Sequence, residues 1–174
     1  FRRVLFRSVS AMSYGSLSKN AVLALNGGAR IGGFYHNTGE GAISDYHVAP
    51  EGDLCWQIGT GYFGCRDDHG NFDLEKFRVN AQRPTVKLIE VKISQGAKPG
   101  HGGILPAVKN TEEIARIRGV KPHTTVASPP GHTAFSNADE LIDFVKTLRE
   151  ASGGKPVGFK LCVGRREEFK DFCR

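Results

Sequence analysis

The segment Val86–Ser94 constrains the fold of this chain more than any other. Its apolar residues are nearly continuous, interrupted only by two lysines, one glutamate and the final serine. Such a run is typical of a parallel strand buried on both faces. Parallel neighbours need long crossover connections, which are usually helical. We therefore expect the rest of the chain to alternate strands with helices.

The flanking sequence carries this alternation. Apolar runs predict three further strands, and Leu54–Ile58 is predicted to form a short hairpin strand. Cap residues and an i, i+3, i+4, i+7 apolar stripe predict helices between the strands. The predicted strands are Val9–Tyr14, a short one within Ala29–Asn37, and Val157–Val163; the predicted helices are Lys19–Leu25 closed by Gly27-Gly28, Leu74–Asn80, a helix that follows Asn110-Thr-Glu-Glu113, Ser136–Ala151, and a helix begun at Arg165-Arg166.

This alternation favours an α/β fold with a parallel sheet, either doubly wound or a (β/α)8 TIM barrel. Four unit strands fit residues 9–174. A complete barrel needs eight strands and typically about 250 residues. The chain is therefore expected to hold a partial (β/α)8 barrel, roughly the first four β/α units.

The two ends of the chain have unusual sequences. Residues 1–8 contain three arginines and match the translation of a common sequencing-adapter oligonucleotide, which suggests that they are not native. The alternative is a genuine basic N-terminal strand. Residues 165–174 begin a helix with no residue to close it. We expect residues 9–174 to be the N-terminal half of a barrel domain that continues beyond Arg174.

The charge balance changes with that interpretation. The 24 basic and 18 acidic residues give a net charge of +6. Without the three arginines of residues 1–8, 21 basic residues remain and the net charge falls to +3. No basic run with interleaved aromatic residues is left to follow a phosphate backbone, so we expect no nucleic-acid partner. No apolar run approaches the roughly 20 residues that span a bilayer.

Two motif-like patterns are interpreted as structural. Gly59-x-Gly61-x-x-Gly64 matches a dinucleotide-binding fingerprint, but turn residues follow it where that fingerprint requires a helix. A glycine-rich turn is the better interpretation. The four cysteines and six histidines show no metal-ligand spacing, so no metal site is predicted and the cysteines are expected to be thiols in a reducing cytoplasm.

The strongest local signal of function is the loop Ser94–Pro106. It follows a buried parallel strand, and in barrels the active site lies at the carboxyl ends of the strands. Its glycines allow a ligand to approach the backbone, Lys98 offers a positive charge and Gln95 an amide. The alternative is a structural loop with a solvated lysine.

Two further positions are candidates for ligand contacts because of their place in or after predicted strands. Glu40 lies between glycines after the predicted strand that ends at Asn37, where it faces either a ligand or the N–H groups of its own turn. Lys160 lies in a strand whose face is otherwise apolar, which favours a ligand contact over a snorkelling surface residue.

Four motifs in this order resemble the FMN-binding synthase domain of the glutamate synthase family, in particular its stand-alone bacterial members. They are Ala11-Met-Ser-Tyr-Gly-Ser-Leu-Ser18, Asn37-Thr-Gly-Glu-Gly41, Gln95-Gly-Ala-Lys-Pro-Gly-x-Gly-Gly103 and Ser128-Pro-Pro130. The resemblance implies a (β/α)8 barrel that binds FMN. It also implies hydride transfer from reduced FMN to 2-iminoglutarate, formed from 2-oxoglutarate and ammonia, to give glutamate.

The resemblance also implies roles for individual residues. Ala11, Met12 and Ser13 match the end of the first strand, whose backbone lies against the flavin ring, and Lys160 matches a lysine near the N1/C2-oxygen edge of the flavin. The residues that match substrate contacts are Glu40, Gln95, Lys98 and Arg118.

Ile104 departs from the family pattern. Many glutamate synthases carry a substrate-binding glutamine there, and an acid where this chain has His101. The alternatives are therefore the same fold acting on another 2-oxo acid or in glutamate N-alkylation, and a non-catalytic barrel subunit. The resemblance further implies glutaminase and electron-donor subunits as partners. It places an iron–sulfur cluster and the flavin-phosphate loops beyond Arg174.

Overall fold

The computed structural model describes residues 8–95 and 100–174, and strands alternate with helices along most of this length. Lys98 and all of the proposed adapter segment except Ser8 lie outside the described residues. The elements are β1 Ser8–Val9, α1 Lys19–Gly32, β2 Tyr35–Asn37, α2 Asp45–Val48, β3 Leu54–Ile58, α3 Leu74–Ala81, β4 Val86–Lys92, β5 Ile104–Leu105, the 3-10 helix η1 Ala107–Lys109, α4 Glu112–Arg118, β6 Val126–Ala127, α5 Ala138–Ala151, β7 Val157–Lys160 and α6 Arg166–Phe172.

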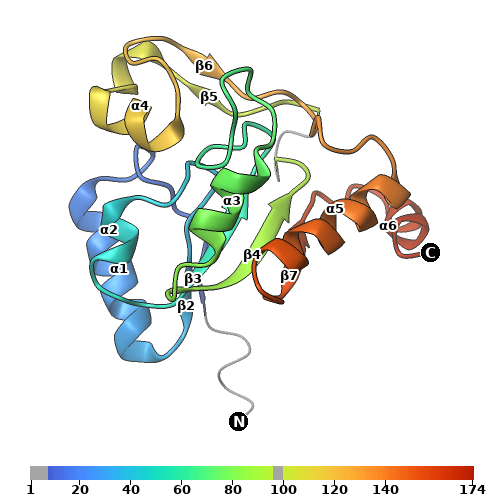
Figure 1. The fold of residues 1–174 in the computed structure, drawn as a ribbon, viewed down its shortest axis with the longest axis horizontal. Coiled ribbons are helices and arrows are strands. Elements are labelled where there is room, and N and C mark those ends of the chain that lie inside the picture. Colours follow the sequence, from blue (N-terminus) through green and yellow to red (C-terminus); the bar gives the residue numbers. More distant parts are fainter. Residues whose placement is uncertain (1–7, 96–99) are drawn as a thin grey trace.

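The main sheet has the order β1-β2-β3-β4-β7, and every neighbouring pair is parallel. The strands are neighbours in the sheet in the same order as they occur in the chain. A barrel has this order, so the sheet fits a partial TIM-barrel-like fold. Figure 1 shows the strands running side by side with their arrowheads toward the same end.

The hairpin prediction for Leu54–Ile58 was wrong. This segment is β3, a central strand that pairs in parallel with β2 and β4. The described sheet therefore has five parallel strands where the sequence predicted four. A short apolar run beside glycines looks the same in a hairpin strand and in a central parallel strand. Only the neighbouring strands distinguish these two kinds of strand.

Helix boundaries follow the cap residues, with one correction. Ser18, Asp73, Thr111 and Asn137 cap their helices through side-chain oxygens. Helix α1, however, continues through Gly27-Gly28 and ends at Gly33, whose φ of 66° is left-handed. The buried side chain of Asn26 bonds to the backbone of Gly52 and Ala29 is fully buried, so tertiary packing outweighs the helical cost of the two glycines.

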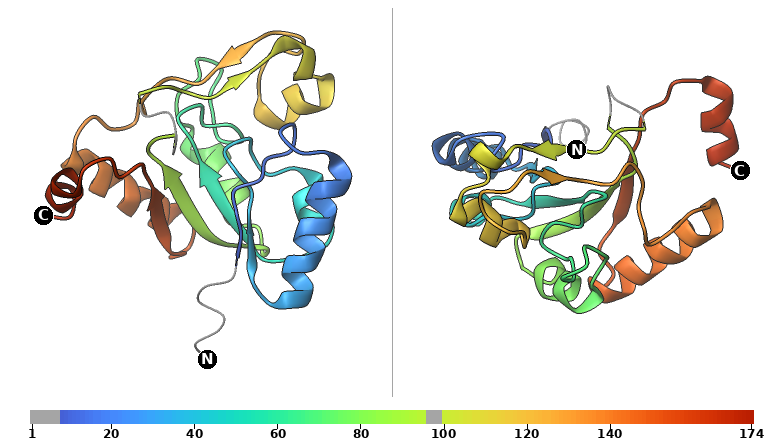
Figure 2. Two further views of the ribbon diagram at one scale, coloured as in Figure 1. Left: turned by 180° about the vertical axis from the view of Figure 1, so that it is seen from behind. Right: turned by 90° about the horizontal axis from the view of Figure 1, so that it is seen from above.

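The two faces of the sheet differ in character. On one face, apolar side chains of β3 and β4 pack against Phe77 of α3 and against Phe144 and Leu148 of α5. Figure 2 shows these two helices on the same side of the sheet. Because side chains alternate between faces, Gln57, Glu90 and Lys92 point the other way. The apolar face holds the core, and the opposite face is lined by polar groups.

The segment between β4 and α5 leaves the sheet. There β5 and β6 form a separate antiparallel pair, with α4 between them. Figure 1 shows this excursion, coloured yellow to orange, lying across the end of the sheet toward which the strands point. We call residues 103–128 the cover segment. Among the described residues, no helix is long and apolar enough to cross a membrane.

Acid should destabilise this fold through His36, which is fully buried against His47. Burial, with repulsion from His47, lowers the pKa of His36 to about 4. The unfolded chain binds the proton near pH 6.5, so the free energy of unfolding is unaffected above that pH and falls as the pH drops toward 4. The full loss is about 3 kcal/mol.

Urea unfolding at pH 7.5 and pH 5 measures this effect. His36→Leu should remove part of the difference between the two midpoints, because burial also lowers the pKa of His47 and of His132. His69→Asn, at an exposed position, should leave the difference intact. An unchanged pH dependence in His36→Leu would show that other groups cause the acid sensitivity.

Candidate functional site

A charged cluster lies at the carboxyl ends of β2 and β4. Glu40 follows β2, Lys92 ends β4 and Gln95 lies three residues further on. Lys92 Nζ lies 2.8 Å from Glu40 Oε1 and donates to Gln95 Oε1 at 2.8 Å, and Gln95 Nε2 donates to Glu40 Oε1 at 2.9 Å. Lys92 is only 8% exposed. A buried ammonium needs such partners, because its desolvation is costly.

The glycine pattern after β3 makes room for this cluster. A Cβ on Gly59 would lie 2.5 Å from Glu40 Oε2 and 2.9 Å from Glu40 Cβ. Glu40 thus reaches Lys92 by passing over the end of β3, where a side chain would block it. The segment then turns at Tyr62–Cys65, and α3 begins only at Leu74. This confirms the glycine-rich turn and excludes the strand-to-helix geometry of a dinucleotide fingerprint.

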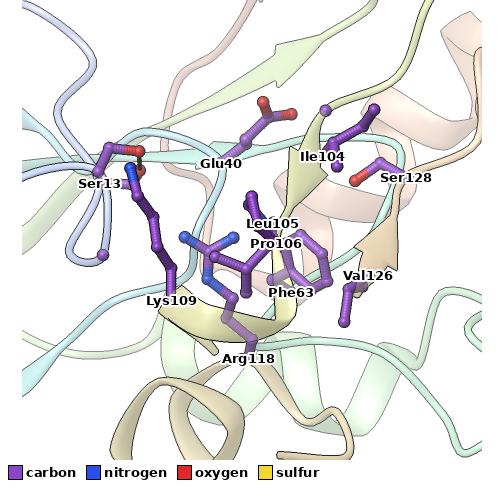
Figure 3. Close-up of a pocket in the computed structure, with 13 residues that line it drawn as sticks. Ser13, Glu40, Phe63, Ile104, Leu105, Pro106, Lys109, Arg118, Val126 and Ser128 are labelled. Carbon is purple, nitrogen blue, oxygen red and sulfur yellow. Dashed lines mark hydrogen bonds between the residues drawn. The ribbon is translucent and has the colours of Figure 1, made fainter. Parts of the chain in front are cut away.

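A cavity of about 230 Å³ lies beside this cluster, between the sheet and the cover segment. Figure 3 shows Arg118 and Lys109 pointing into the space bordered by Ser13, Glu40 and Ile104. The cavity has one polar and one apolar side. Its lining residues are Ser13, Gly15, Ser16, Glu40, Phe63, Gly103, Ile104, Leu105, Pro106, Lys109, Arg118, Val126 and Ser128. We call this the upper cavity.

Arg118 is the buried cation of the upper cavity. It is 7% exposed, lies over the Phe63 ring at 5.2 Å and donates from Nη2 to the carbonyl of Tyr14 at 3.2 Å. Its Nε has no hydrogen-bond partner among the described residues. Burial lowers the pKa of Arg118, although the Glu40 carboxylate opposes the shift. A guanidinium with spare donors in a cavity suits a carboxylate ligand.

The backbone after β1 separates this cavity from a second one. Met12 N donates to the carbonyl of Asn37 at 3.1 Å, and the Met12 carbonyl lies 2.9 Å from His47 Nε2. A Cβ on Gly39 would lie 2.8 Å from Ser13 N, so the two loops are in close contact. Ser13 therefore lines the upper cavity from a backbone segment that is held by the loop after β2 and by His47 of α2.

The second cavity, also of about 230 Å³, lies on the polar face of the sheet. Here the Glu90 carboxylate accepts hydrogen bonds from Asn37 Nδ2 at 2.9 Å and Gln57 Nε2 at 2.5 Å. Lys160 ends β7 beside β4. We call this the inner cavity, and it is lined by Ser8, Val9, Ser10, Ala11, Tyr35, Asn37, Glu90 and Lys160.

The structure thus brings most of the sequence-predicted residues together. Ala11 and Lys160 line the inner cavity, and Ser13, Glu40 and Arg118 line the upper one. Gln95 contacts Glu40 and Lys92, and Met12 forms the connecting backbone. Lys98 lies outside the described residues. Within the part of the chain that the structure describes, no group of three or more potential metal ligands lies together.

Sequence reasoning missed four polar residues of this region: Asn37, Gln57, Glu90 and Lys92. The signal was present in β4, because Glu90 and Lys92 lie two residues apart and so share a face. The interpretation of Val86–Ser94 as a nearly continuous apolar strand, buried on both faces, did not use that alternation. Gln57 and Glu90 are directly paired in the β3–β4 register, which needs the sheet order to be seen.

Comparison with known proteins identifies relatives over most of the chain. Residues 4–172 match the family described as "Conserved region in glutamate synthase". The chain is 44% identical over 163 residues to the glutamate synthase large subunit-like protein YerD of Bacillus subtilis, which covers 93% of this chain and 31% of that protein.

Two further relatives are more distant. An archaeal-type glutamate synthase [NADPH] of Thermotoga maritima is 36% identical over 88% of this chain and 28% of its own length. The glutamate synthase [NADPH] large chain of Bacillus subtilis is 34% identical over 87% of this chain and 10% of its own length. The chain therefore spans less than a third of the length of each of these relatives.

Gly59→Ala tests the packing of the charged cluster. The added methyl group must displace Glu40 from Lys92, and overpacking of this kind typically costs about 1–3 kcal/mol. We expect the urea midpoint to fall accordingly. Gly131→Ala is the control, because a Cβ there meets nothing within 4 Å. Equal effects of the two substitutions would contradict the steric role of Gly59.

Proposed function

The chain belongs to the glutamate synthase family, and from this membership we propose that it forms the substrate-binding part of an FMN-dependent oxidoreductase that makes glutamate. In the proposed reaction 2-oxoglutarate and ammonia condense to 2-iminoglutarate and water. A hydride and a proton then convert the imine to glutamate. One observation carries the proposal: Glu40 and Arg118 line one cavity, and Ala11 and Lys160 line another on the same sheet.

We assign the 2-oxo acid to the upper cavity. The guanidinium of Arg118 supplies unused donors for one substrate carboxylate, and Lys109 supplies a second, exposed positive charge on the same wall. Besides the Glu40 carboxylate, the remaining polar side chains of the lining are the hydroxyls of Ser13, Ser16 and Ser128. Gln95 and Lys98 are proposed as further carboxylate contacts from the loop that follows β4.

We assign the ring of FMN to the inner cavity. The pyrimidine edge of a flavin presents two carbonyl oxygens around one N–H group. The cavity offers an ammonium at Lys160, an amide at Asn37 and a carboxylate at Glu90, so its donors and acceptors fit that edge. The backbone of Ala11, Met12 and Ser13 would lie against the ring. Bound FMN would supply the hydride, and Lys160 would place positive charge where reduced flavin is anionic.

The cluster of Glu40, Lys92 and Gln95 is proposed to handle protons. Glu40 lines the upper cavity and shares its Oε1 with Lys92 and Gln95, while a Cβ on Gly59 would approach its other oxygen. Addition of ammonia to a keto carbon places a positive charge on nitrogen. The Glu40 carboxylate is the acidic side chain in the cavity lining that can accept a proton from that nitrogen.

The remaining components are proposed from the family. They are a glutaminase subunit as a source of ammonia, an electron-donor subunit, and an iron–sulfur cluster that delivers electrons. The names of two relatives include NADPH, which we propose as the ultimate electron source. A cytoplasmic location fits this supply.

A functional assay of the full-length protein tests the proposal. Purified protein should show the two absorption bands of oxidised FMN and should form glutamate from 2-oxoglutarate, ammonia and reduced flavin. Correctly folded protein without flavin would instead support a non-catalytic barrel subunit.

Two substitutions test the assignment of the two cavities. Arg118→Ala removes charge-assisted hydrogen bonds and should raise KM for 2-oxoglutarate by about 10- to 100-fold, at unchanged flavin content. Lys160→Met should lower flavin content or the flavin reduction potential, with a smaller effect on KM. If both variants lose flavin and substrate affinity to the same degree, the division between the cavities is wrong.

Ile104 favours a second candidate substrate. Its side chain is 72% exposed and lines the upper cavity with Leu105, Pro106 and Val126. These four side chains form an apolar wall in the same cavity as Arg118 and Lys109. A 2-oxo acid with an alkyl side chain would bury that chain on the wall without leaving a second carboxylate unpaired. The alkyl group of an N-alkylated glutamate would be buried there too, although both of its carboxylates would still need partners.

Ile104→Gln distinguishes the two substrates. The new amide should improve kcat/KM for 2-oxoglutarate relative to 2-oxoisocaproate by about 10-fold or more, because it adds a donor where the wall has none. Steady-state assays with a panel of 2-oxo acids provide the measurement. A wild-type preference for 2-oxoglutarate that Ile104→Gln does not increase would exclude the alkyl substrate.

A further inference from the structure

The cavity arginine does not come from the sheet. Arg118 is the last residue of α4, which belongs to the cover segment, whereas Glu40 follows strand β2. The two sides of the upper cavity therefore belong to different parts of the fold. Their spacing depends on how α4 is fastened to the loops at the end of the sheet.

One carboxylate makes the shortest hydrogen bonds of this attachment, beside a 3.8 Å ion pair between the exposed side chains of Arg116 on α4 and Asp45 on α2. Glu113 of α4 accepts a hydrogen bond from Tyr14 Oη at 2.5 Å on Oε2 and from Tyr46 Oη at 2.6 Å on Oε1. Tyr14 lies in the loop after β1, and Tyr46 lies on α2. The two rings pack edge to face at 4.8 Å, and Lys19 Nζ lies 5.3 Å from the Tyr46 ring centroid. Glu113 thus joins three segments that are distant in sequence.

The same tyrosine also contacts the arginine. Tyr14 donates its hydroxyl to Glu113, and its carbonyl accepts from Arg118 Nη2 at 3.2 Å. The guanidinium fits only because glycines surround it: a Cβ on Gly41 would lie 2.9 Å from Nη2, and one on Gly15 would lie 3.3 Å away. Small displacements of α4 would drive Arg118 into these backbones or away from Tyr14.

We propose that Glu113 is a positioning residue, which holds Arg118 at the correct distance across the upper cavity through Tyr14 and Tyr46. This inference rests on the proposed function, in which Arg118 binds a substrate carboxylate. Glu113 itself does not line the cavity. Its two carboxylate oxygens are used by the tyrosines, which lower the pKa of Glu113 by donating to it, Tyr14 the more strongly.

The test is a KM-against-kcat comparison in the full-length protein. Glu113→Gln keeps the side-chain shape but removes the charge and replaces one acceptor oxygen by a donor. One tyrosine can then no longer donate to residue 113, and the bond of the other is no longer charge-assisted. KM for 2-oxoglutarate should rise about 5- to 20-fold, with kcat within about twofold and flavin content unchanged. Tyr46→Phe removes one hydroxyl and should raise KM by a smaller factor. It carries the test if Glu113→Gln does not fold.

Glu112→Gln is the matched control. It makes the same chemical change one residue earlier on α4, at an exposed position whose only described ion-pair contact is His123 at 3.5 Å. Its KM should equal that of the wild type. A rise as large as that of Glu113→Gln would show a general charge effect and overturn the positioning role.

A double-mutant cycle tests the positioning role of Glu113 separately from the substrate-binding role of Arg118. In an Arg118→Ala background, Glu113→Gln should cause no further rise in KM, because the residue it positions is gone. Multiplicative effects would overturn the inference while leaving the assigned role of Arg118 intact. If Arg118→Ala alone leaves KM unchanged, the proposed substrate site is wrong, and the positioning role falls with it.

Discussion

The ion pair between Glu40 and Lys92 is the interaction on which this end of the molecule depends. It spans β3, because its members follow β2 and end β4 on either side of that strand. A buried ammonium without its carboxylate would cost several kcal/mol, so the pair fixes the path of the loop after β2. It also requires a residue without a side chain at the end of β3, which Gly59 supplies. Three segments of the chain are therefore constrained by one contact.

The division into two cavities follows from the same constraint. The loop after β2 is held above the sheet by Glu40, and its Gly39 presses against the backbone of Ser13. That contact places the segment Ala11–Ser13 between the cavities, with Ala11 facing the inner one and Ser13 the upper one. A cofactor and a substrate bound in the two cavities would meet along this backbone. The proposed hydride transfer would take place at this point, because it needs the two ligands to lie close together.

The sequence predicted much of the fold and part of the site, for identifiable reasons. Capping residues act locally, so Ser18 and Asp73 marked the starts of their helices correctly. The role of β3 depends on its neighbours, and the persistence of α1 through Gly27-Gly28 depends on packing against a distant loop. Both effects are tertiary, and local patterns do not carry them.

The residues of the candidate site also divide into those that a local pattern indicates and those that only tertiary contacts bring together. Glu40 and Lys160 could be proposed from the sequence because they follow or end predicted strands, and each lines a cavity in the structure. Lys92 was missed although its face could be read from the alternation along β4. Arg118 was reached only through family resemblance, since no spacing rule connects α4 with β2. The Tyr14–Glu113 contact joins residues 99 positions apart, beyond any local signal.

The cover segment explains why such a long-range contact is needed. Its α4 is a single short helix whose buried apolar residues are Ile114 and Ala115, and η1 beside it has no buried side chain. Apolar packing alone therefore gives α4 little orientation, since burial is non-directional. Hydrogen bonds to a carboxylate, in contrast, have preferred distances and angles. Helix α4 carries the arginine that we propose binds the ligand but has only two buried apolar side chains. Directional bonds therefore hold it in place, and Glu113, between two hydroxyls, supplies them.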